Sequence, residues 1–250
     1  MASREKSSYS IKVVEKALDM LEAFSHETDE FTIAHIAKIL EISRASAFRL
    51  MATFEHRGYV EKSTATDKYT IGVTALETSQ NLLSSIDLIN KAKPIMEKLA
   101  RECNESVYLC IPKRDEILLL DMVTSTQKVQ VISLAGKRYP SASIAAGKVI
   151  LAHSKTNSEN LTEFSEIRQR GYCFDLDSID EGIACIAVPI FSKKRRVCGS
   201  LCLIGPTFRI ADSKANPTLL SELTSAGQLL STKLGHSGLD LRHQFPRQTG

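Results

Sequence analysis

Residues 32–72 read TIAHIAKILEISRASAFRLMATFEHRGYVEKSTATDKYTIG. In and just before this segment, apolar side chains recur three and four residues apart, which is the spacing of one helical stripe. They form three sets: Val14, Ala17, Leu18 and Leu21; Ile33, Ile36, Ala37 and Leu40; Ala47, Leu50, Met51 and Phe54. The pattern predicts three short helices, with a tight turn between Leu40 and Ser43.

Each of the last two helices has a hydroxyl residue at its expected start. Thr32 precedes the second helix and Ser43 the third, and both side chains can accept a hydrogen bond from a first-turn amide. After the third helix, residues 58–62 and 68–72 flank a polar turn, which predicts a β-hairpin. Three helices followed by a hairpin are typical of a winged helix-turn-helix, whose recognition helix enters the major groove of DNA.

The third helix carries residue types suited to reading DNA. If its apolar set faces inward, a 100° step per residue turns the small and polar residues outward. These let the helix approach the groove and supply hydrogen bonds to base edges, while residues at helix starts and in the hairpin suit phosphates. The candidate DNA contacts are Thr32, Ser43, Arg44, Ala45, Ser46, Arg49, Thr53, Lys62 and Lys68.

Bulk charge does not identify a nucleic-acid partner. The net charge is +3, yet residues 1–80 hold ten Lys and Arg against twelve Asp and Glu, so the basic footprint is local, between Ser43 and Lys68. Two alternatives stay open on this ground. One is a small helical bundle with solvated arginines, and the other is a ligand-binding sensor that acts through protein partners without specific DNA binding.

The second half mixes helical and strand-like patterns. Helices are predicted over 73–86, over 87–103 with Pro94 inside, and over 142–153, 158–170 and 217–234; strands are predicted over 107–111, 117–123, 129–134, 183–191 and 197–204. The fold class is α+β, with a sheet face that can enclose a ligand. The expected division is a DNA-binding domain 1–72, a linker helix 73–89, an effector-binding domain 90–234 and a flexible tail 235–250.

Several function classes find no support. There is no run of eighteen apolar residues, and the first thirty positions are polar and charged. We therefore expect neither a membrane span nor a secretory signal. The expected location is the cytoplasm. The six cysteines lack C-x-x-C pairing and lie in apolar runs, which predicts buried thiols and no metal. Gly147-Lys148 lacks the first glycine and the Ser or Thr of a phosphate loop. We therefore expect no cofactor.

An enzyme is the main rival class, with Cys185 as nucleophile and His153 as base. Cys185 lies within an apolar run, and no acid follows at a spacing that would orient a histidine. We accordingly expect no catalytic residues and no enzymatic activity.

Four sequence signatures, taken in order, resemble the isocitrate lyase regulator (IclR) family over residues 10–234. The first is the N-terminal match, which combines Val14-x-x-Ala17-Leu18-x-x-Leu21, Ile36-Ala37, the segment 43–50, Gly58-Tyr59-Val60 and residues 69–72. The other three lie in the C-terminal half: residues 140–152, with Gly147-Lys148 and Leu151-Ala152, then 168–172 and 182–190.

The resemblance implies a winged helix-turn-helix, a linker helix and a GAF-like α/β effector domain in a homodimer or tetramer. The partners would be double-stranded DNA at a pseudo-palindromic operator and a small organic effector, either a carboxylate or an aromatic compound. By position, the family's effector pocket falls on Val131, Leu134, Ala145, Ala146, Asp175, Ile183, Cys185 and Cys202. Asp175 would bind a hydroxyl or a carbonyl hydrate.

Four positions depart from the family pattern. Ala45 stands for a serine, Ile144 for a threonine, Ser178 for an acidic residue and Ala184 for an arginine. The joint loss of an acid and a base predicts an altered ion pair or a less polar pocket.

Overall fold

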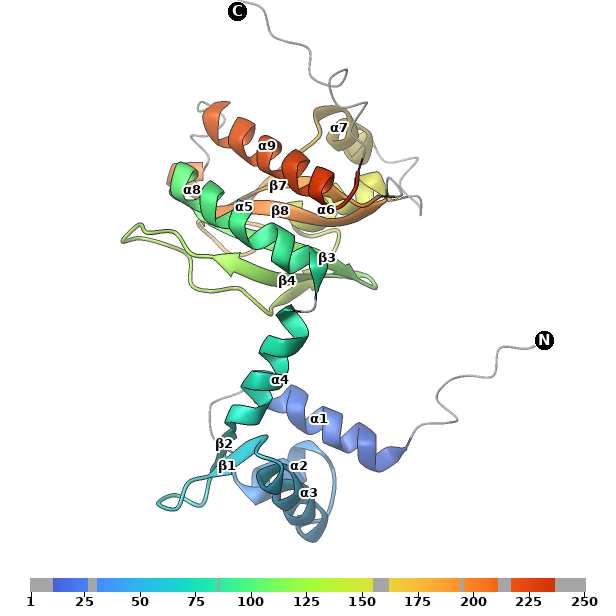
Figure 1. Cartoon of the computed structure of the whole chain (residues 1–250), viewed down its shortest axis with the longest axis vertical. Coiled ribbons are helices and arrows are strands. Elements are labelled where there is room, and N and C mark those ends of the chain that lie inside the picture. The colour runs from blue at the N-terminus through green and yellow to red at the C-terminus, as the bar shows by residue number, and fades with distance from the viewer. Residues whose placement is uncertain are drawn as a thin grey trace, which may run out of the picture. The chain divides into compact units, whose positions relative to one another are not determined.

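The computed structural model describes residues 11–26, 31–84, 86–154, 162–193, 196–210 and 217–236. Residues 237–250 of the predicted tail and 158–161 of the predicted helix lie outside these ranges. The chain forms two compact units, Met1–Ser85 and Ile86–Gly250 (Figure 1). Among the described helices, none is long and apolar enough to cross a membrane.

The first unit contains the three predicted helices and the hairpin. Its elements are α1 (Lys12–His26), α2 (Ile33–Ile39), α3 (Arg44–His56), β1 (Val60–Lys62), β2 (Tyr69–Ile71) and α4 (Val73–Ser84). β1 and β2 pair antiparallel, and Phe31 adds a bridge to Tyr69. Phe31, Ile36 and Met51 are fully buried in the core of this unit. The helical periodicity and the hairpin signal are thus both confirmed.

Helix α1 uses a different face from the stripe that the sequence suggested. Val14 and Leu18 are 51% and 55% exposed. The core contacts come from Met20, which is fully buried, and from Phe24, with Leu21 as the member of the predicted stripe that packs against the core. The N-terminal half of α1 therefore presents apolar side chains to its surroundings.

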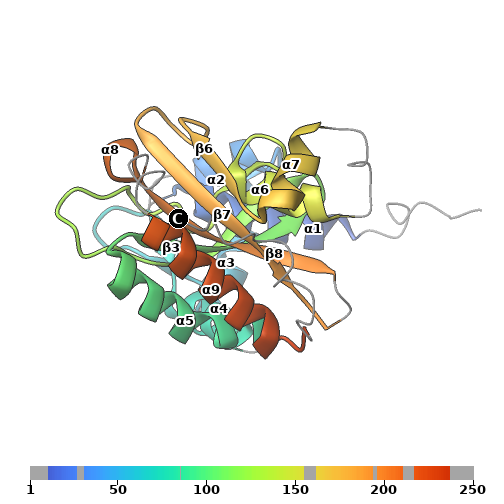
Figure 2. The same cartoon turned by 90° about the horizontal axis from the view of Figure 1, so that it is seen from above.

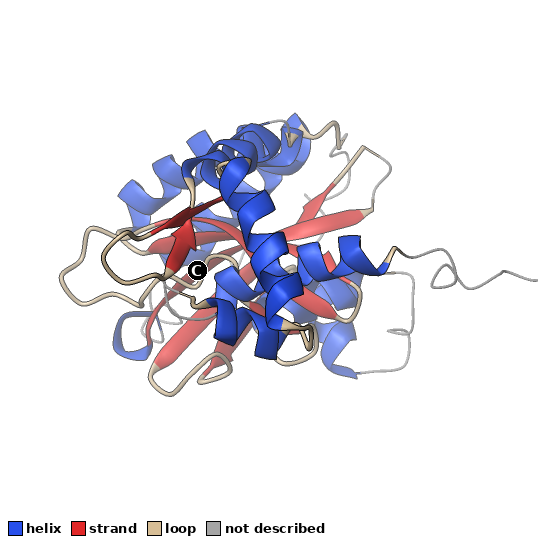
Figure 3. Cartoon of the chain, turned by 90° about the horizontal axis from the view of Figure 1, so that it is seen from below, coloured by secondary structure: helices blue, strands red, loops and turns tan. Residues whose placement is uncertain are grey.

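The second unit is a six-stranded antiparallel sheet covered on both faces by helices. Its strands are β3 (Ser106–Lys113), β4 (Glu116–Val123), β5 (Arg138–Pro140), β6 (Cys173–Leu176), β7 (Ile183–Phe191) and β8 (Val197–Pro206), in the order β5-β4-β3-β8-β7-β6. Its helices are α5 (Asp87–Cys103), α6 (Ala145–His153), α7 (Thr162–Arg170), α8 (Thr207–Ile210) and α9 (Pro217–Lys233). Figure 3 colours the strands red and the helices blue.

Alternate residues of each strand enter two separate cores, because successive side chains point to opposite faces. On one face α5 and α9 lie side by side (Figure 2) and pack on residues such as Leu109 and Val188. On the other face α6 and α7 cover residues such as Cys185 and Cys202. α5 continues through Pro94.

The predicted strand over 129–134 is wrong. Residues 124–137 form a loop between β4 and β5. The side chains of Val131 and Leu134 are buried in the core, whereas Val129 and Ile132 are 58% and 75% exposed. The apolar run therefore contains two residues that anchor a loop, and it is not a hydrogen-bonded strand. The short elements β5, β6 and α8 were missed, since three or four residues leave too little periodicity to detect.

The stability of this unit is expected to decrease as pH falls below about 6.5. The His153 ring is near Phe191, with centroids 5.4 Å apart, and its Nδ1 lies 2.9 Å from the Val149 carbonyl oxygen. Burial lowers the pKa of His153 from its ordinary 6.5. The unfolded chain then takes up a proton first as pH falls, which favours unfolding. Urea titrations between pH 7.5 and 5 check this, and His153→Gln should flatten the dependence below pH 6.5.

Candidate functional site

Helix α3 is held at its start by a side-chain cap. Ser43 has an extended backbone, and its Oγ accepts from the Ser46 amide at 3.1 Å and donates to Ser46 Oγ at 3.0 Å. Thr32 caps α2 in the same way, since its Oγ1 accepts from the His35 amide at 3.2 Å. Both predicted caps are confirmed, and they set the positions at which two helices begin.

The outward face of α3 is open to solvent. Ala47 and Met51 are fully buried, so the opposite side projects away from the core. The exposed predicted DNA contacts are Arg44, Ala45, Ser46, Arg49 and Thr53. Phe48, which the sequence reasoning missed, is 57% exposed beside them. Its position directly before Arg49, outside the apolar set of the helix, was the available signal in the sequence.

Hairpin residue Lys62 is already paired within the chain. Its Nζ lies 2.7 Å from Asp67 Oδ1 and 5.9 Å from the centre of the Tyr69 ring. The hydrogen bond that Lys62 donates to Asp67 raises the pKa of Lys62, so the lysine stays protonated. A phosphate would have to compete with Asp67 for this ammonium. Lys68, in the same hairpin, is half-buried.

A groove of about 590 Å³ runs between α1 and α3. Val13, Val14 and Ala17 form one wall, and Ser46, Arg49, Leu50, Thr53 and Phe54 form the other. The exposed apolar half of α1 therefore faces the polar residues of α3 across an open space.

Removing the Ser43 cap is expected to destabilise the first unit. Ser43→Ala leaves a first-turn amide of α3 without its acceptor, at a cost of about 1 kcal/mol. Chemical denaturation followed by a signal from this unit measures the loss. Ser43→Asn retains an acceptor and should stay close to wild type, so equal losses for both variants would contradict the capping role.

In the second unit, the eight predicted effector residues come together on one face of the sheet. β6 pairs Asp175 with Cys185 on β7, and β8 places Cys202 next to that pair. The first two residues of α6, Ala145 and Ala146, are fully buried in this core. Val131, Leu134 and Ile183 pack against the same cluster.

An ion pair that the sequence did not reveal closes one side of this cluster. Lys148 Nζ lies 3.1 Å from Asp175 Oδ1 and 3.3 Å from Glu163 Oε1. Burial acts to lower the pKa of Lys148, but the hydrogen bond and charge of Asp175 raise it above its usual value. Asp175 and Lys148 are only 11% and 19% exposed. The ammonium of Lys148 is therefore shared by two carboxylates, those of Asp175 and Glu163.

The departure at Ala184 does not change the pocket. Ala184 is fully buried in the core beneath α5 and α9, on the opposite face from Cys185. Ile144, which stands for a threonine, directly precedes α6 and is buried with the pocket residues. Ala184, the position of the lost base, therefore lies outside the cluster of predicted effector residues, and the prediction of an altered ion pair or a less polar pocket gains no support from it.

Buried thiols line the face of the sheet beneath α6. Cys110 and Cys202 have sulfurs 3.8 Å apart, and a hydrogen bond to Cys202 together with burial raises the pKa of Cys185. His153 packs on Phe191, six residues along β7 from Cys185, which is about 20 Å at 3.3 Å per residue. This separation rules out the Cys185–His153 pair as a catalytic dyad.

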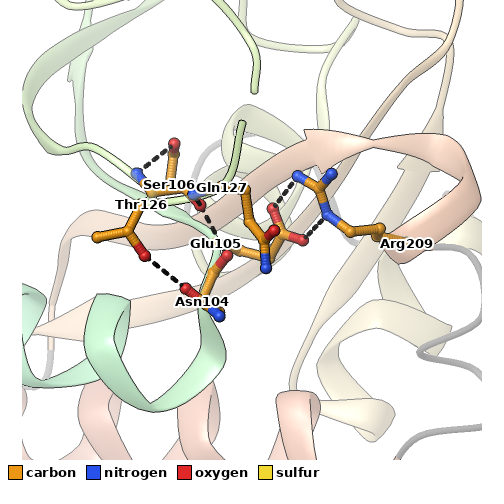
Figure 4. Close-up of polar contacts among 7 residues, drawn as sticks. Asn104, Glu105, Ser106, Thr126, Gln127 and Arg209 are labelled. Carbon is orange, nitrogen blue, oxygen red and sulfur yellow. Dashed lines mark hydrogen bonds and ion pairs between the residues drawn. The ribbon is translucent and has the colours of Figure 1, made fainter. Parts of the chain in front are cut away.

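The loop that carries Val131 and Leu134 is fastened at its start by a polar network, shown in Figure 4. Ser125 Oγ donates to the Asn104 carbonyl at 2.7 Å, and Thr126 Oγ1 donates to Asn104 Oδ1 at 2.8 Å. Nearby, Glu105 accepts two hydrogen bonds from Arg209 of α8, one of them 3.1 Å long. The bonds of Ser125 and Thr126 to Asn104 hold the start of the loop beside the end of α5.

Sequence reasoning missed three polar residues of this interior, Lys148, Tyr108 and Ser200. Ser200 Oγ donates to the Ala146 carbonyl at 2.9 Å, which ties α6 to β8. Alternation along the strands could have identified Tyr108 and Ser200, since each lies two residues from a predicted or thiol position. In the ranges the structure describes, no three His, Cys, Asp or Glu residues are grouped so as to hold a metal ion.

Family models cover most of the chain. Residues 13–64 match the IclR helix-turn-helix domain, and residues 80–161 and 155–232 match the bacterial transcriptional regulator IclR C-terminal domain. The HTH-type transcriptional regulator XynR of Escherichia coli is 26% identical over 248 residues, covering 90% of this chain and 98% of that protein.

Solved structures share the fold. An IclR-type transcriptional regulator from Alicyclobacillus acidocaldarius superposes with a TM-score of 0.78 at 19% identity, covering 91% of this chain and all of the other. An IclR homologue from Microbacterium hydrocarbonoxydans, crystallised with 4-hydroxybenzoate, has a TM-score of 0.72 at 20% identity, covering 89% and 98% of the two chains.

Proposed function

Because the chain belongs to the IclR family of bacterial transcriptional regulators, we propose that its helix α3 reads operator DNA and that the interior between α6 and the sheet binds the effector. The chain is a DNA-binding transcriptional regulator whose C-terminal domain binds a small-molecule effector. The alternative of a sensor that does not bind DNA finds no support in these matches.

One observation supports the DNA assignment most strongly. The Ser43 cap and the buried Ala47 and Met51 orient α3 so that Arg49 and Ser46 face outward together. An arginine on an exposed helix face can bond two acceptors of a guanine. Arg44, Ser43 and Thr32, at helix starts, suit phosphates, and Lys62 and Lys68 suit the flanking backbone.

The effector assignment rests on the convergence of small, apolar and charged groups at the start of α6. Ala145 and Ala146 leave first-turn amides without side chains in front of them, where a carboxylate could bind. The relative crystallised with 4-hydroxybenzoate supports an aromatic carboxylate as one candidate class. The residues we assign to this site are the eight predicted ones together with Lys148.

A two-fold DNA reader requires a two-fold protein. α4 exposes Val73, Leu76, Leu82 and Leu83, so we assign residues 73–89 as a linker that pairs with its copy in a homodimer, which can associate further into a tetramer. The DNA-binding domain would then end at residue 72, and the effector domain would span 90–234. The proposal places the protein in the cytoplasm and gives it no catalytic step.

Selection of genomic DNA fragments by the purified protein, at two salt concentrations, tests the function. Enrichment of one pseudo-palindromic site that persists at the higher salt supports sequence-specific regulation. Binding that vanishes uniformly with salt would leave only phosphate contacts and contradict the assignment of α3. The affinity for the selected DNA is then measured with and without 4-hydroxybenzoate. An unchanged affinity would exclude aromatic carboxylates as the effector class.

A further inference from the structure

Phe48 is an exposed aromatic residue on the helix that we assign to DNA. Its side chain is 57% exposed, and Arg49 beside it and Arg44 one turn before it are exposed as well. Ala45 and Ala52 lie three residues before and four residues after Phe48, so all three share one exposed stripe of the α3 surface. Because alanine side chains are short, the ring of Phe48 projects beyond its neighbours on this stripe.

This apolar stripe lies beside a polar one on the same helix. Ser46, Arg49 and Thr53 line the groove between α1 and α3, whereas Phe48 is absent from its lining. Ser43 donates a hydrogen bond to Ser46 Oγ, so the Ser46 hydroxyl keeps its own proton for a partner. A guanidinium also only donates. Ser46 and Arg49 therefore offer donors, which suit the acceptors on the major-groove edge of guanine.

The apolar stripe requires a different group of the DNA. Thymine is the base that presents a methyl group in the major groove, whereas the other bases are distinguished there by donors and acceptors. An apolar side chain buried against a donor or an acceptor would leave that polar group without a partner, which is unfavourable. A thymine methyl group packed against the ring of Phe48 instead removes apolar surface of both partners from water. The chemistry of the stripe thus favours thymine.

We propose that Phe48, with Ala45 and Ala52 on either side, is a specificity-determining residue that reads the methyl group of a thymine in each half-site. Phe48 and Arg49 are neighbours on the helix, about 100° and about 1.5 Å apart, so the thymine lies in the same short stretch of base pairs that Arg49 reads. This inference rests on the proposed function of α3 and adds the chemical identity of one base in its operator.

Replacement of thymine by deoxyuridine tests the contact, because the exchange removes only the 5-methyl group. The probe is the DNA fragment that the wild-type protein selects, with its thymines replaced one at a time. One position in each half-site should weaken binding about fourfold, the effect of one buried methyl-sized group, and replacement in both half-sites should weaken it about fifteenfold. Fluorescence anisotropy at constant salt measures the affinities. Equal affinity for every substituted fragment would overturn the proposal.

Phe48→Ala shows whether this side chain reads the methyl group. The variant should fold, because the position is exposed and alanine is the best helix former. It should bind the thymine and deoxyuridine fragments equally. Phe208→Ala is the matched control, because Phe208 is 65% exposed and lies on α8 in the second unit. The control should keep the full preference for thymine, and a Phe48→Ala variant that also keeps it would overturn the proposal.

The outcomes separate this inference from the function on which it rests. Specific binding by the wild type without any thymine preference overturns the methyl contact alone and leaves the regulator function standing. Failure of the wild type to select any specific fragment contradicts both. A Phe48→Ala variant that keeps the preference but sediments as a smaller species would assign Phe48 to a contact with a second copy of the chain, and this also overturns the proposal.

Discussion

Replacing Arg49 with alanine is expected to weaken binding to the operator by about 1 to 3 kcal/mol for each half-site, or roughly fivefold to more than a hundredfold. The guanidinium lies on the exposed face of α3, opposite the buried Met51. In a two-fold dimer that reads two half-sites, the loss of binding free energy would be twice as large. The loss should appear as relaxed preference at one base-pair position in each half-site, measured by competition with substituted operators.

Lys62→Ala is the matched control for the arginine substitution. It also removes one positive charge, but from a hairpin lysine that is already paired with Asp67. A phosphate contact contributes about one unit or less to the salt slope and carries no sequence information. The control should therefore reduce the salt dependence and leave sequence preference unchanged. Equal loss of specificity in both variants would show that Arg49 does not make the base contacts.

Gly147→Ala is expected to destabilise the second unit by at least about 3 kcal/mol, at the upper end of the range for overpacking. A Cβ on Gly147 would lie closer to the Ser141 carbonyl oxygen than the 3.0 Å that real Cβ atoms keep. That neighbour is backbone, in the segment leading from β5 to α6, so α6 would have to move. The gain in helix propensity, about 1 kcal/mol, is too small to compensate.

Gly227→Ala in α9 separates this clash from a general effect of removing a helical glycine. Its Cβ would lie 2.7 Å from a methyl carbon, Cγ2 of Val188, rather than from backbone. Because a side-chain end can shift more cheaply, we expect a smaller loss. Urea denaturation of both variants measures the difference. If Gly147→Ala is as stable as Gly227→Ala, the close approach of α6 to Ser141 is not rigid.

The effector interior was predictable only in part. The eight positions inferred from the family resemblance lie together in the structure. Six of them sit on strands or at the start of α6, and Val131 and Leu134 reach the same core from the loop 124–137. Lys148 was not predicted as part of the site. It lies one turn into α6, and nothing in the neighbouring sequence indicates that it meets Asp175, 27 residues later along the chain.

The loop 124–137 shows how a local pattern can mislead. Val129, Val131, Ile132 and Leu134 are β-branched or apolar residues of the kind that favours strands. In the structure only Val131 and Leu134 are buried. No neighbouring strand lies in reach to complete a ladder, and the side chains of Ser125 and Thr126 bind Asn104 instead.

The sequence by itself determined the three helices of the first unit, the caps at Thr32 and Ser43, and the hairpin that follows. These features depend on residues within one or two turns of each other, so the side-chain periodicity and the capping hydroxyls suffice to specify them. The tertiary structure alone decided the sheet order, the core contacts of α1, the course of the loop 124–137, and the meeting of Lys148 with Asp175. Each of these depends on which distant segments pack together, and that is set by the burial of whole faces rather than by any local pattern.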